Sequence, residues 1–313
     1  MSLFVTLSMF KICDQPWPND ALYLMRSLFD LIMENLSSRY PDKFALIKET
    51  WRVTQEDGWS KSDRFYKVYS PEIIGSWGAD MREIKKDIRY MRPTLRCKLG
   101  RRKFDIDTGL GLARARQGDD ADPHPLPTRS ERHMFLILPK DIFLKMDQSV
   151  FVEAFSRVCA RLGVTYAVID DMRIASASSI EQFTFERETA PLRAGKPQIT
   201  LPTIAWWQYI APPMGERTGT LGMIQENCPC FRAQRYAFDG NEGLSIQLTE
   251  DLKDATLEKR MGLRVFFKDS LNPLPIDTVT YAMRLNPDWL EYLPITEDER
   301  REALERIQMN EKG

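Results

Sequence analysis

Two adjacent tryptophans, Trp206 and Trp207, constrain the fold more than any other feature of the sequence. They lie in the segment Pro-Thr-Ile-Ala-Trp-Trp-Gln-Tyr-Ile-Ala-Pro, which begins at Pro202, contains Tyr209 and ends at Pro212. Large aromatic side chains bury much apolar area, so a cluster of this kind belongs to a core or an interface. The closing Pro-Pro pair stops any regular element, because proline has no N–H group and fixes φ. The segment holds no His or Cys, so we interpret this Trp-Trp segment as a structural pivot.

The composition is typical of a soluble globular protein with room for one large or two modest domains. Of the 313 residues, 43% are hydrophobic and 28% are charged, and the net charge is −1, so no binding to nucleic acid or membrane is expected. The N-terminus lacks the basic start and the cleavage site of a signal sequence and is interpreted as a buried strand. The cysteines are scattered and are expected to be free thiols of a cytoplasmic protein: Cys13, Cys97, Cys159, Cys228 and Cys230.

Both halves of the sequence open with a strand–helix–strand pattern. In each half, two apolar stretches flank an amphipathic helix, and in the second half Asp147 can cap the helix and Gly163 can end it. This order predicts an α+β fold in which two ferredoxin-like halves pack into one compact unit. The expected strands cover residues 3–12 and 44–47 in the first half, and 133–138 and 164–169 in the second.

A polar loop separates the two halves. Residues 117–130 include Gly-Asp-Asp-Ala-Asp-Pro-His-Pro and are expected to form a linker. It divides the chain into an N-terminal half, 1–116, and a C-terminal half, 131–313. The C-terminal half contains the Trp-Trp segment and ends in a polar helix, which a capping box at Thr296 opens.

Periodicity predicts four further elements. Apolar residues at helical spacing indicate a helix over residues 81–91 that ends before Pro93. Alternating apolar residues indicate strands over 104–110 and 244–248, and a helix is expected over 255–267.

The Cys-Pro-Cys sequence at Cys228 and Cys230 invites a metal or redox interpretation. A zinc site needs further ligands, and the sequence offers no second cysteine pair and only His124 and His133. A redox motif more often has two residues between its cysteines. We therefore interpret the pair as structural.

Several carboxylates are candidates for metal or acid chemistry. Glu83 and Lys85 match half of a nuclease signature but fall in the predicted helix, where they would be solvated. Asp105 and Asp107 share one face of a predicted strand and could hold a hard cation. Asp170-Asp171 closes a predicted strand at its C-terminal end, where α/β active sites often lie. Either aspartate pair could equally consist of turn-forming residues that face solvent.

The sequence assembles no complete catalytic set. With only two histidines, the sequence offers few candidates for a Ser-His-Asp or Cys-His catalytic arrangement. It contains no dinucleotide-binding or phosphate-binding loop motif. We expect no catalytic residue, cofactor or metal, and a protein that is not an enzyme. One basic cluster lacks an aromatic stacking series, so it is interpreted as a solvated face or a contact for an acidic partner: Arg92, Arg96, Lys98, Arg101, Arg102 and Lys103, extended by Arg114 and Arg116.

The Trp-Trp segment resembles the Pro-x-Ile/Val-x-Trp-x-x-Tyr/Phe-x-Gly-Pro segment of the type VI secretion immunity family, bacterial proteins that neutralise a toxic effector. The order of elements is similar over most of the chain, including Leu138-Pro139-Lys140 before a helix and Leu271-Asn272-Pro273-Leu274 after another. The chain departs from the family pattern at Ala211, where Gly is usual, and at the additional Pro213. Residues 55–130 have no match.

The resemblance implies a cytoplasmic, non-enzymatic inhibitor that binds one cognate effector. The Trp-Trp segment would then be either a buried pivot or an exposed anchor that fills a pocket on the effector. If the effector is a nuclease, its basic cleft would attract acidic loops. We therefore expect the effector to contact two acidic clusters, the first preferred: Asp119, Asp120 and Asp122, and then Glu250, Asp251 and Asp254.

Two alternatives stay open at this point. One is a metal-dependent phosphodiesterase or nuclease that uses Asp105, Asp107 or Glu83 with Lys85. The other is a structural adaptor of a secretion apparatus or phage, which would form a stable oligomer without a toxin partner.

Overall fold

The computed structural model describes residues 4–13, 18–55, 65–69, 88–111, 130–171, 201, 204–212, 220–267 and 297–311. The chain divides into two compact units. The N-terminal unit comprises Leu3–Ala167 and Ala237–Asn241. The C-terminal unit comprises Met1–Ser2, Val168–Tyr236 and Glu242–Gly313.

The N-terminal unit is built on an antiparallel sheet with strand order β3-β2-β4-β5-β6-β1. Side chains alternate across it as in any pleated sheet, so that Val5 and Leu7 of β1 are buried on one face, as are Leu136 and Leu138 of β6. Antiparallel pairing joins all neighbouring strands. The strands are β1 (Phe4–Cys13), β2 (Phe44–Gln55), β3 (Phe65–Tyr69), β4 (Ile88–Leu99), β5 (Arg102–Gly111) and β6 (Ser130–Pro139).

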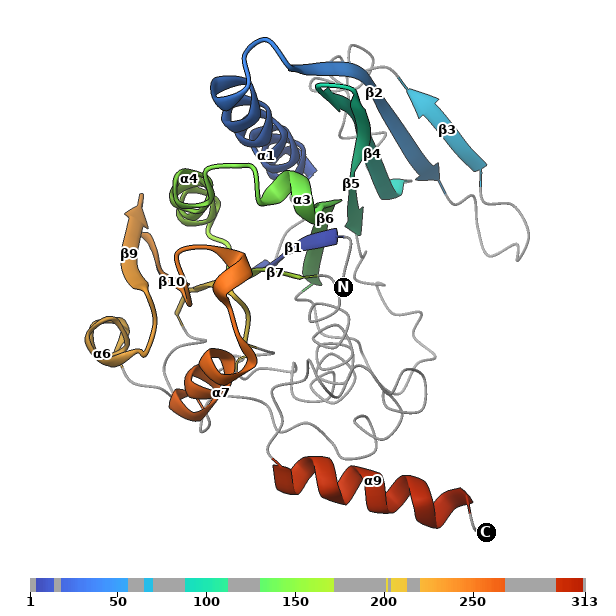
Figure 1. Ribbon diagram of the computed structural model, residues 1–313. Helices are drawn as coiled ribbons and strands as arrows, with labels where there is room; N and C mark the ends of the chain where they lie inside the picture. The colour runs from blue at the N-terminus through green and yellow to red at the C-terminus, as the bar shows by residue number, and fades with distance from the viewer. Residues whose placement is uncertain are drawn as a thin grey trace, which may run out of the picture. The chain divides into compact units, whose positions relative to one another are not determined.

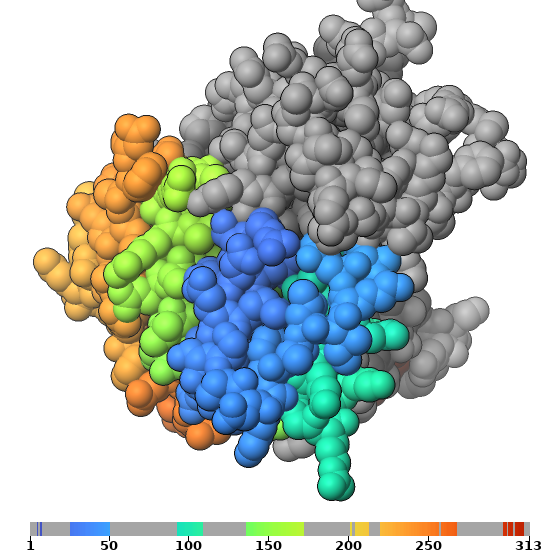
Figure 2. Space-filling view, turned by 90° about the horizontal axis from the view of Figure 1, so that it is seen from above, coloured from blue at the N-terminus to red at the C-terminus, as the bar shows by residue number. Residues whose placement is uncertain are grey.

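Two long helices of this unit, α1 (Pro18–Arg39) and α4 (Gln148–Leu162), pack against each other (Figure 1). The space-filling view shows residues of α1 and β2 beside those of the β4–β5 hairpin on one face (Figure 2). Asn35 joins the helices, because its amide donates to the Asp147 carbonyl at 2.9 Å and accepts from the Asp147 N–H at 2.8 Å. Between β6 and α4 lies the short helix α3 (Lys140–Phe143).

Helix α4 begins and ends where the sequence predicts. The Asp147 carboxylate accepts a hydrogen bond from the Val150 N–H at 3.0 Å, which caps the first turn. Gly163 adopts φ 61°, and the Val164 N–H donates to the Cys159 carbonyl at 2.9 Å, which closes the last turn. The helix buries Phe151, Phe155 and Cys159, among others, on its apolar face.

The predicted helix over residues 81–91 is wrong where the structure describes it. Residues Ile88–Leu99 form strand β4, which pairs with β2 and β5. From Pro93 onwards the burial alternates as in a strand, with Pro93, Leu95 and Cys97 buried and Arg96 exposed. Pro93 is tolerated because the pairing with β5 is interrupted at Arg92 and Pro93 and resumes at Thr94.

The C-terminal unit contains strands in the order β7-β8-β10-β9. Strand β7 (Tyr166–Asp171) runs into it from the N-terminal unit, and β8 (Trp207–Ile210) pairs antiparallel with β10 (Asn241–Gln247), with Trp207 opposite Gln247. The other strand is β9 (Arg232–Phe238). The helices are α6 (Leu221–Asn227), the 3₁₀ turn η2 (Leu252–Asp254), α7 (Leu257–Phe266) and α9 (Glu297–Glu311).

The predicted α+β class is confirmed, since antiparallel sheet and packed helices occur in both units. The strand–helix–strand order also holds in both halves of the sequence, as β1-α1-β2 and as β6-α4-β7. The expected linker over 117–130 lies, except for Ser130, outside the described residues, so the division into 1–116 and 131–313 stays a prediction. Thr296, expected to open the last helix, also lies outside them.

Candidate functional site around the Trp-Trp segment

Trp206 and Trp207 lie in the core of the C-terminal unit. Both side chains are 0% exposed, which agrees with the interpretation as a buried pivot and not with that as an exposed anchor. Each indole N–H has a partner, as buried polar groups require. Trp206 Nε1 donates to the Thr249 carbonyl at 3.0 Å and lies 3.1 Å from Thr249 Oγ1, whereas Trp207 Nε1 donates to Ser245 Oγ at 2.8 Å.

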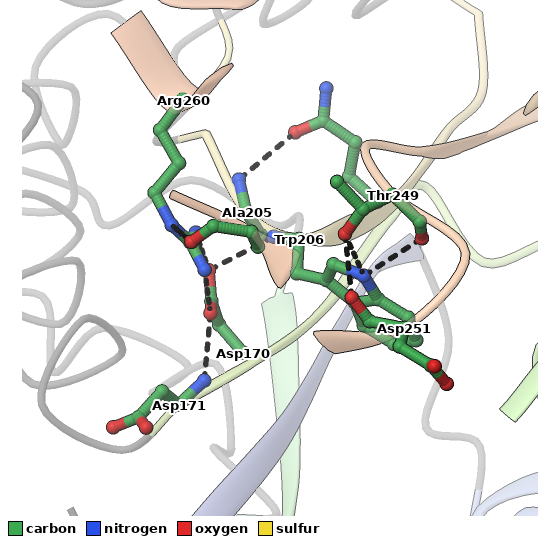
Figure 3. A network of polar contacts seen from close by, with 9 residues as sticks. Asp170, Asp171, Ala205, Trp206, Thr249, Asp251 and Arg260 are labelled. Atoms are coloured by element: carbon green, nitrogen blue, oxygen red, sulfur yellow. Dashed lines mark hydrogen bonds and ion pairs between the residues drawn. The ribbon is translucent and has the colours of Figure 1, made fainter. Parts of the chain in front are cut away.

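A buried ion pair lies beside Trp206 (Figure 3). Arg260 of α7 donates from both terminal nitrogens to Asp170 of β7, with Nη2 at 2.7 Å from Oδ1, and the two side chains are 3% and 2% exposed. The same carboxylate accepts the Trp206 N–H at 2.9 Å and the Asp171 N–H at 2.7 Å. Asp170 therefore ties strand β7, helix α7 and the Trp-Trp segment together.

This geometry corrects one interpretation of Asp170-Asp171. Neither acid faces solvent, since their exposed fractions are 2% and 9%. A carboxylate that already accepts hydrogen bonds from a guanidinium and two backbone N–H groups is held as a structural anion. We assign Asp170 a structural role.

The second predicted acidic cluster forms a turn directly behind Trp206, which we call the acidic turn (Glu250–Asp254). Its base is held by side chains of the core: Gln247 Nε2 donates to the Glu250 carbonyl at 2.8 Å, and Thr249 Oγ1 donates to the Asp251 carbonyl at 2.7 Å. The Leu248 N–H donates to the Trp206 carbonyl at 2.8 Å, which links the segment just before the acidic turn to the Trp-Trp segment. The backbone of the acidic turn is therefore fixed before any partner binds.

Lys253 partly neutralises the negative charge of the acidic turn. Lys253 Nζ lies 3.2 Å from Asp251 Oδ2, and the hydrogen bond and charge of Asp251, with the charges of Asp254 and Glu250, raise the pKa of Lys253. Glu250 and Asp254 are exposed, whereas Asp251 is half-buried. The turn presents three acids around one base, so its surface is net negative.

Tyr209, near the C-terminal end of β8, packs against Gly243 of the neighbouring strand β10. A Cβ built on Gly243 of β10 would lie 2.3 Å from Tyr209 Cζ and Oη, so the ring occupies the space that a side chain would need. The Tyr209 side chain is 1% exposed. Pro202 lies outside the described residues, and Pro212 is exposed in the turn after β8.

We expect Gly243→Ala to lower the free energy of unfolding by about 1–3 kcal/mol, because the buried tyrosine ring must move to admit a methyl group. Urea denaturation measures this change. Gly262→Ala on α7 is the matched control, since nothing lies within 4 Å of the added Cβ. Helix propensity predicts that the control gains up to about 1 kcal/mol. Equal stability of the two variants would contradict this packing.

The carboxylates considered for metal chemistry in β5 have protein partners. Arg96 Nε and Nη2 each donate to Asp105 at 2.9 Å, and this hydrogen bonding lowers the pKa of Asp105. Asp107 Oδ1 accepts from Thr94 Oγ1 at 2.8 Å. Glu83, Lys85 and the acids Asp119, Asp120 and Asp122 lie outside the described residues. Within the part of the chain that the structure describes, no three His, Cys, Asp or Glu side chains gather as a metal site.

The basic cluster also contains ion pairs. Arg96 pairs with Asp105, and Arg102 pairs with Asp141 at the start of α3. Lys98, Arg101 and Lys103 are exposed around the β4–β5 turn, which agrees with the interpretation as a solvated face. Arg114 and Arg116 lie outside the described residues.

Sequence reasoning missed the residues that hold the Trp-Trp segment in place. Arg260, Thr249 and Ser245 were not singled out, although one signal was present. Arg260 falls in line with the buried Leu263 and Phe267 on the apolar face of the predicted helix over 255–267. A charged residue on an apolar helix face indicates a buried partner of opposite charge.

No family model matches the sequence, and no curated protein matches it. Among solved structures, the chain is similar to one described as Pseudomonas aeruginosa T6SS protein PA0821, at 13% sequence identity and a TM-score of 0.44, over 86% of this chain and 73% of that chain. No helix among the described residues is long and apolar enough to cross a membrane.

Proposed function

We propose that this chain is an immunity protein that binds a toxic effector of a type VI secretion system in the cytoplasm and blocks its active site. The observation that carries the proposal is the acidic turn, a net negative surface loop whose backbone is fixed to the buried Trp-Trp segment. The same segment carries the sequence resemblance to the immunity family. The hydrogen bond from Trp206 to the Thr249 carbonyl therefore connects the segment that resembles the family to the candidate contact.

A fixed loop suits tight inhibition. Binding a flexible loop loses free energy because side chains and backbone must be ordered, whereas a loop held by its own core has already been ordered by folding. Immunity complexes can be among the tightest non-covalent pairs, with dissociation constants of about a nanomolar or below. In this proposal the acidic turn is a preorganised anionic loop that blocks the effector's active site and has no catalytic function.

The expected partner surface is basic. Exposed carboxylates of Glu250 and Asp254 would steer association with a cationic cleft, such as that of a nuclease, and long-range attraction chiefly raises the association rate. Screening by salt would weaken this attraction over a Debye length of about 10 Å at 0.1 M.

We expect Glu250→Lys to slow association with the effector by about tenfold at low salt, with a smaller effect at high salt. Stopped-flow or surface-binding kinetics at two salt concentrations measure the change. Glu226→Lys is the matched control, because it makes the same charge change at another exposed acid of the C-terminal unit, on α6. Equal rates for the two variants would remove the acidic turn from the contact.

The same kinetic measurement compares the contribution of the first predicted acidic cluster to the association rate with that of the acidic turn. Replacing Asp119, Asp120 and Asp122 by Lys tests whether those acids contact the effector first, as the sequence suggests. Slower association for that variant alone would move the contact to residues 119–122 while leaving the inhibitor proposal in place.

A further inference from the structure

The pair Cys228 and Cys230 differs from Cys97 and Cys159 in its surroundings. Both of its side chains are half-buried, whereas those of Cys97 and Cys159 are buried in the N-terminal unit. The pair lies where α6 ends and the chain turns towards β9, with an exposed proline between the two cysteines. These two cysteines are thus less buried than Cys97 and Cys159.

The backbone holds the two thiols together. The Cys228 N–H donates to the Ile224 carbonyl at 2.9 Å, which ends α6, and the Cys230 N–H donates to the Cys228 carbonyl at 2.8 Å. A three-residue turn of this kind shortens the Cα–Cα separation towards the range of about 4.4–6.8 Å that disulfides span. The turn therefore places the two cysteines close together in the chain's fold.

The surroundings of the two sulfurs shift their pKa values in opposite directions. The hydrogen bond from Cys228 and another from the Arg232 N–H stabilise the Cys230 thiolate and lower the pKa of Cys230 against the effect of burial. The same contact, with burial, raises the pKa of Cys228, so its proton stays on. Burial alone raises the pKa of Cys159. Of the two thiols, Cys230 therefore has the greater thiolate character.

We propose that Cys228-Pro229-Cys230 is a thiol–disulfide exchange site whose co-substrate is a small disulfide of the glutathione class. The Cys230 thiolate attacks one sulfur of that disulfide, and the first glutathione leaves as its thiolate. Cys228 then loses its proton and attacks the Cys230 sulfur, which forms the intramolecular disulfide and releases the second glutathione. Two electrons pass from the protein dithiol to the small disulfide. This site is independent of the proposed inhibitor function.

The test exposes the reduced, folded, full-length protein to oxidised glutathione, followed by acid quenching, alkylation and peptide mass spectrometry. We expect the peptide with both cysteines to lose two hydrogens, while Cys97 and Cys159 stay reduced as internal controls. Cys228→Ser should stop at one glutathione on Cys230, and Cys230→Ser should react at least about tenfold more slowly. The proposal is overturned if the pair reacts no faster than the buried cysteines, or if the two serine variants react equally fast.

Discussion

Arg260→Met is expected to lower the free energy of unfolding by about 3–5 kcal/mol, the cost of leaving one partner of a buried ion pair without the other. The substitution preserves much of the side-chain length but leaves the Asp170 carboxylate, 2% exposed, without a cation. The neighbouring N–H groups of Trp206 and Asp171 cannot replace a full positive charge. Urea denaturation at neutral pH measures the loss.

The controls separate the ion pair from helix α7 itself. Lys259→Met removes an exposed cation from the neighbouring position and should change stability by about 0.5 kcal/mol or less. Asp170→Asn combined with Arg260→Met removes both charges, keeps an acceptor oxygen beside the Trp206 and Asp171 N–H groups, and should recover part of the lost stability, because no unpaired ion remains. If Arg260→Met is no less stable than Lys259→Met, the pair does not hold the unit together.

Trp206→Ala should cost a similar amount, about 3–5 kcal/mol, because it removes a side chain that is 0% exposed and leaves a cavity. It also removes the donor to Thr249 at the base of the acidic turn. Thermal or urea unfolding measures the loss. Phe231→Ala is the control, since that aromatic side chain is 52% exposed and should contribute little.

Trp206→Phe distinguishes the two contributions of the indole. It keeps most of the buried ring but loses the N–H donor, so the loss of stability should be smaller than in Trp206→Ala. If the indole positions the acidic turn, this variant should also associate more slowly with the effector. A Trp206→Phe variant that binds at the unchanged rate would show that the turn holds its shape without that hydrogen bond.

Elements with a complete local signature could be predicted from the sequence. Helix α4 has a capping aspartate, an apolar face and a terminal glycine, and the structure shows all three in those roles. The Asp239-Gly240 pair at the β9–β10 turn carries another such signal, and both residues have positive φ.

Contacts between distant residues could not be predicted in the same way. Asp170 and Arg260 are 90 positions apart, and the sequence around either residue does not indicate which residue is its partner. The pattern before Pro93 shows the opposite failure, because apolar spacing compatible with a helix was outweighed by the pairing of β4 with β2 and β5. Tertiary contacts decided both cases.

The most direct measurement for the proposed function is co-expression of this chain with the product of the neighbouring gene. We expect that product to be toxic alone, harmless with this chain, and recovered with it as a stoichiometric complex. A harmless neighbour that forms no complex would contradict the proposal for that pair. A stable oligomer of this chain alone would then favour the structural adaptor.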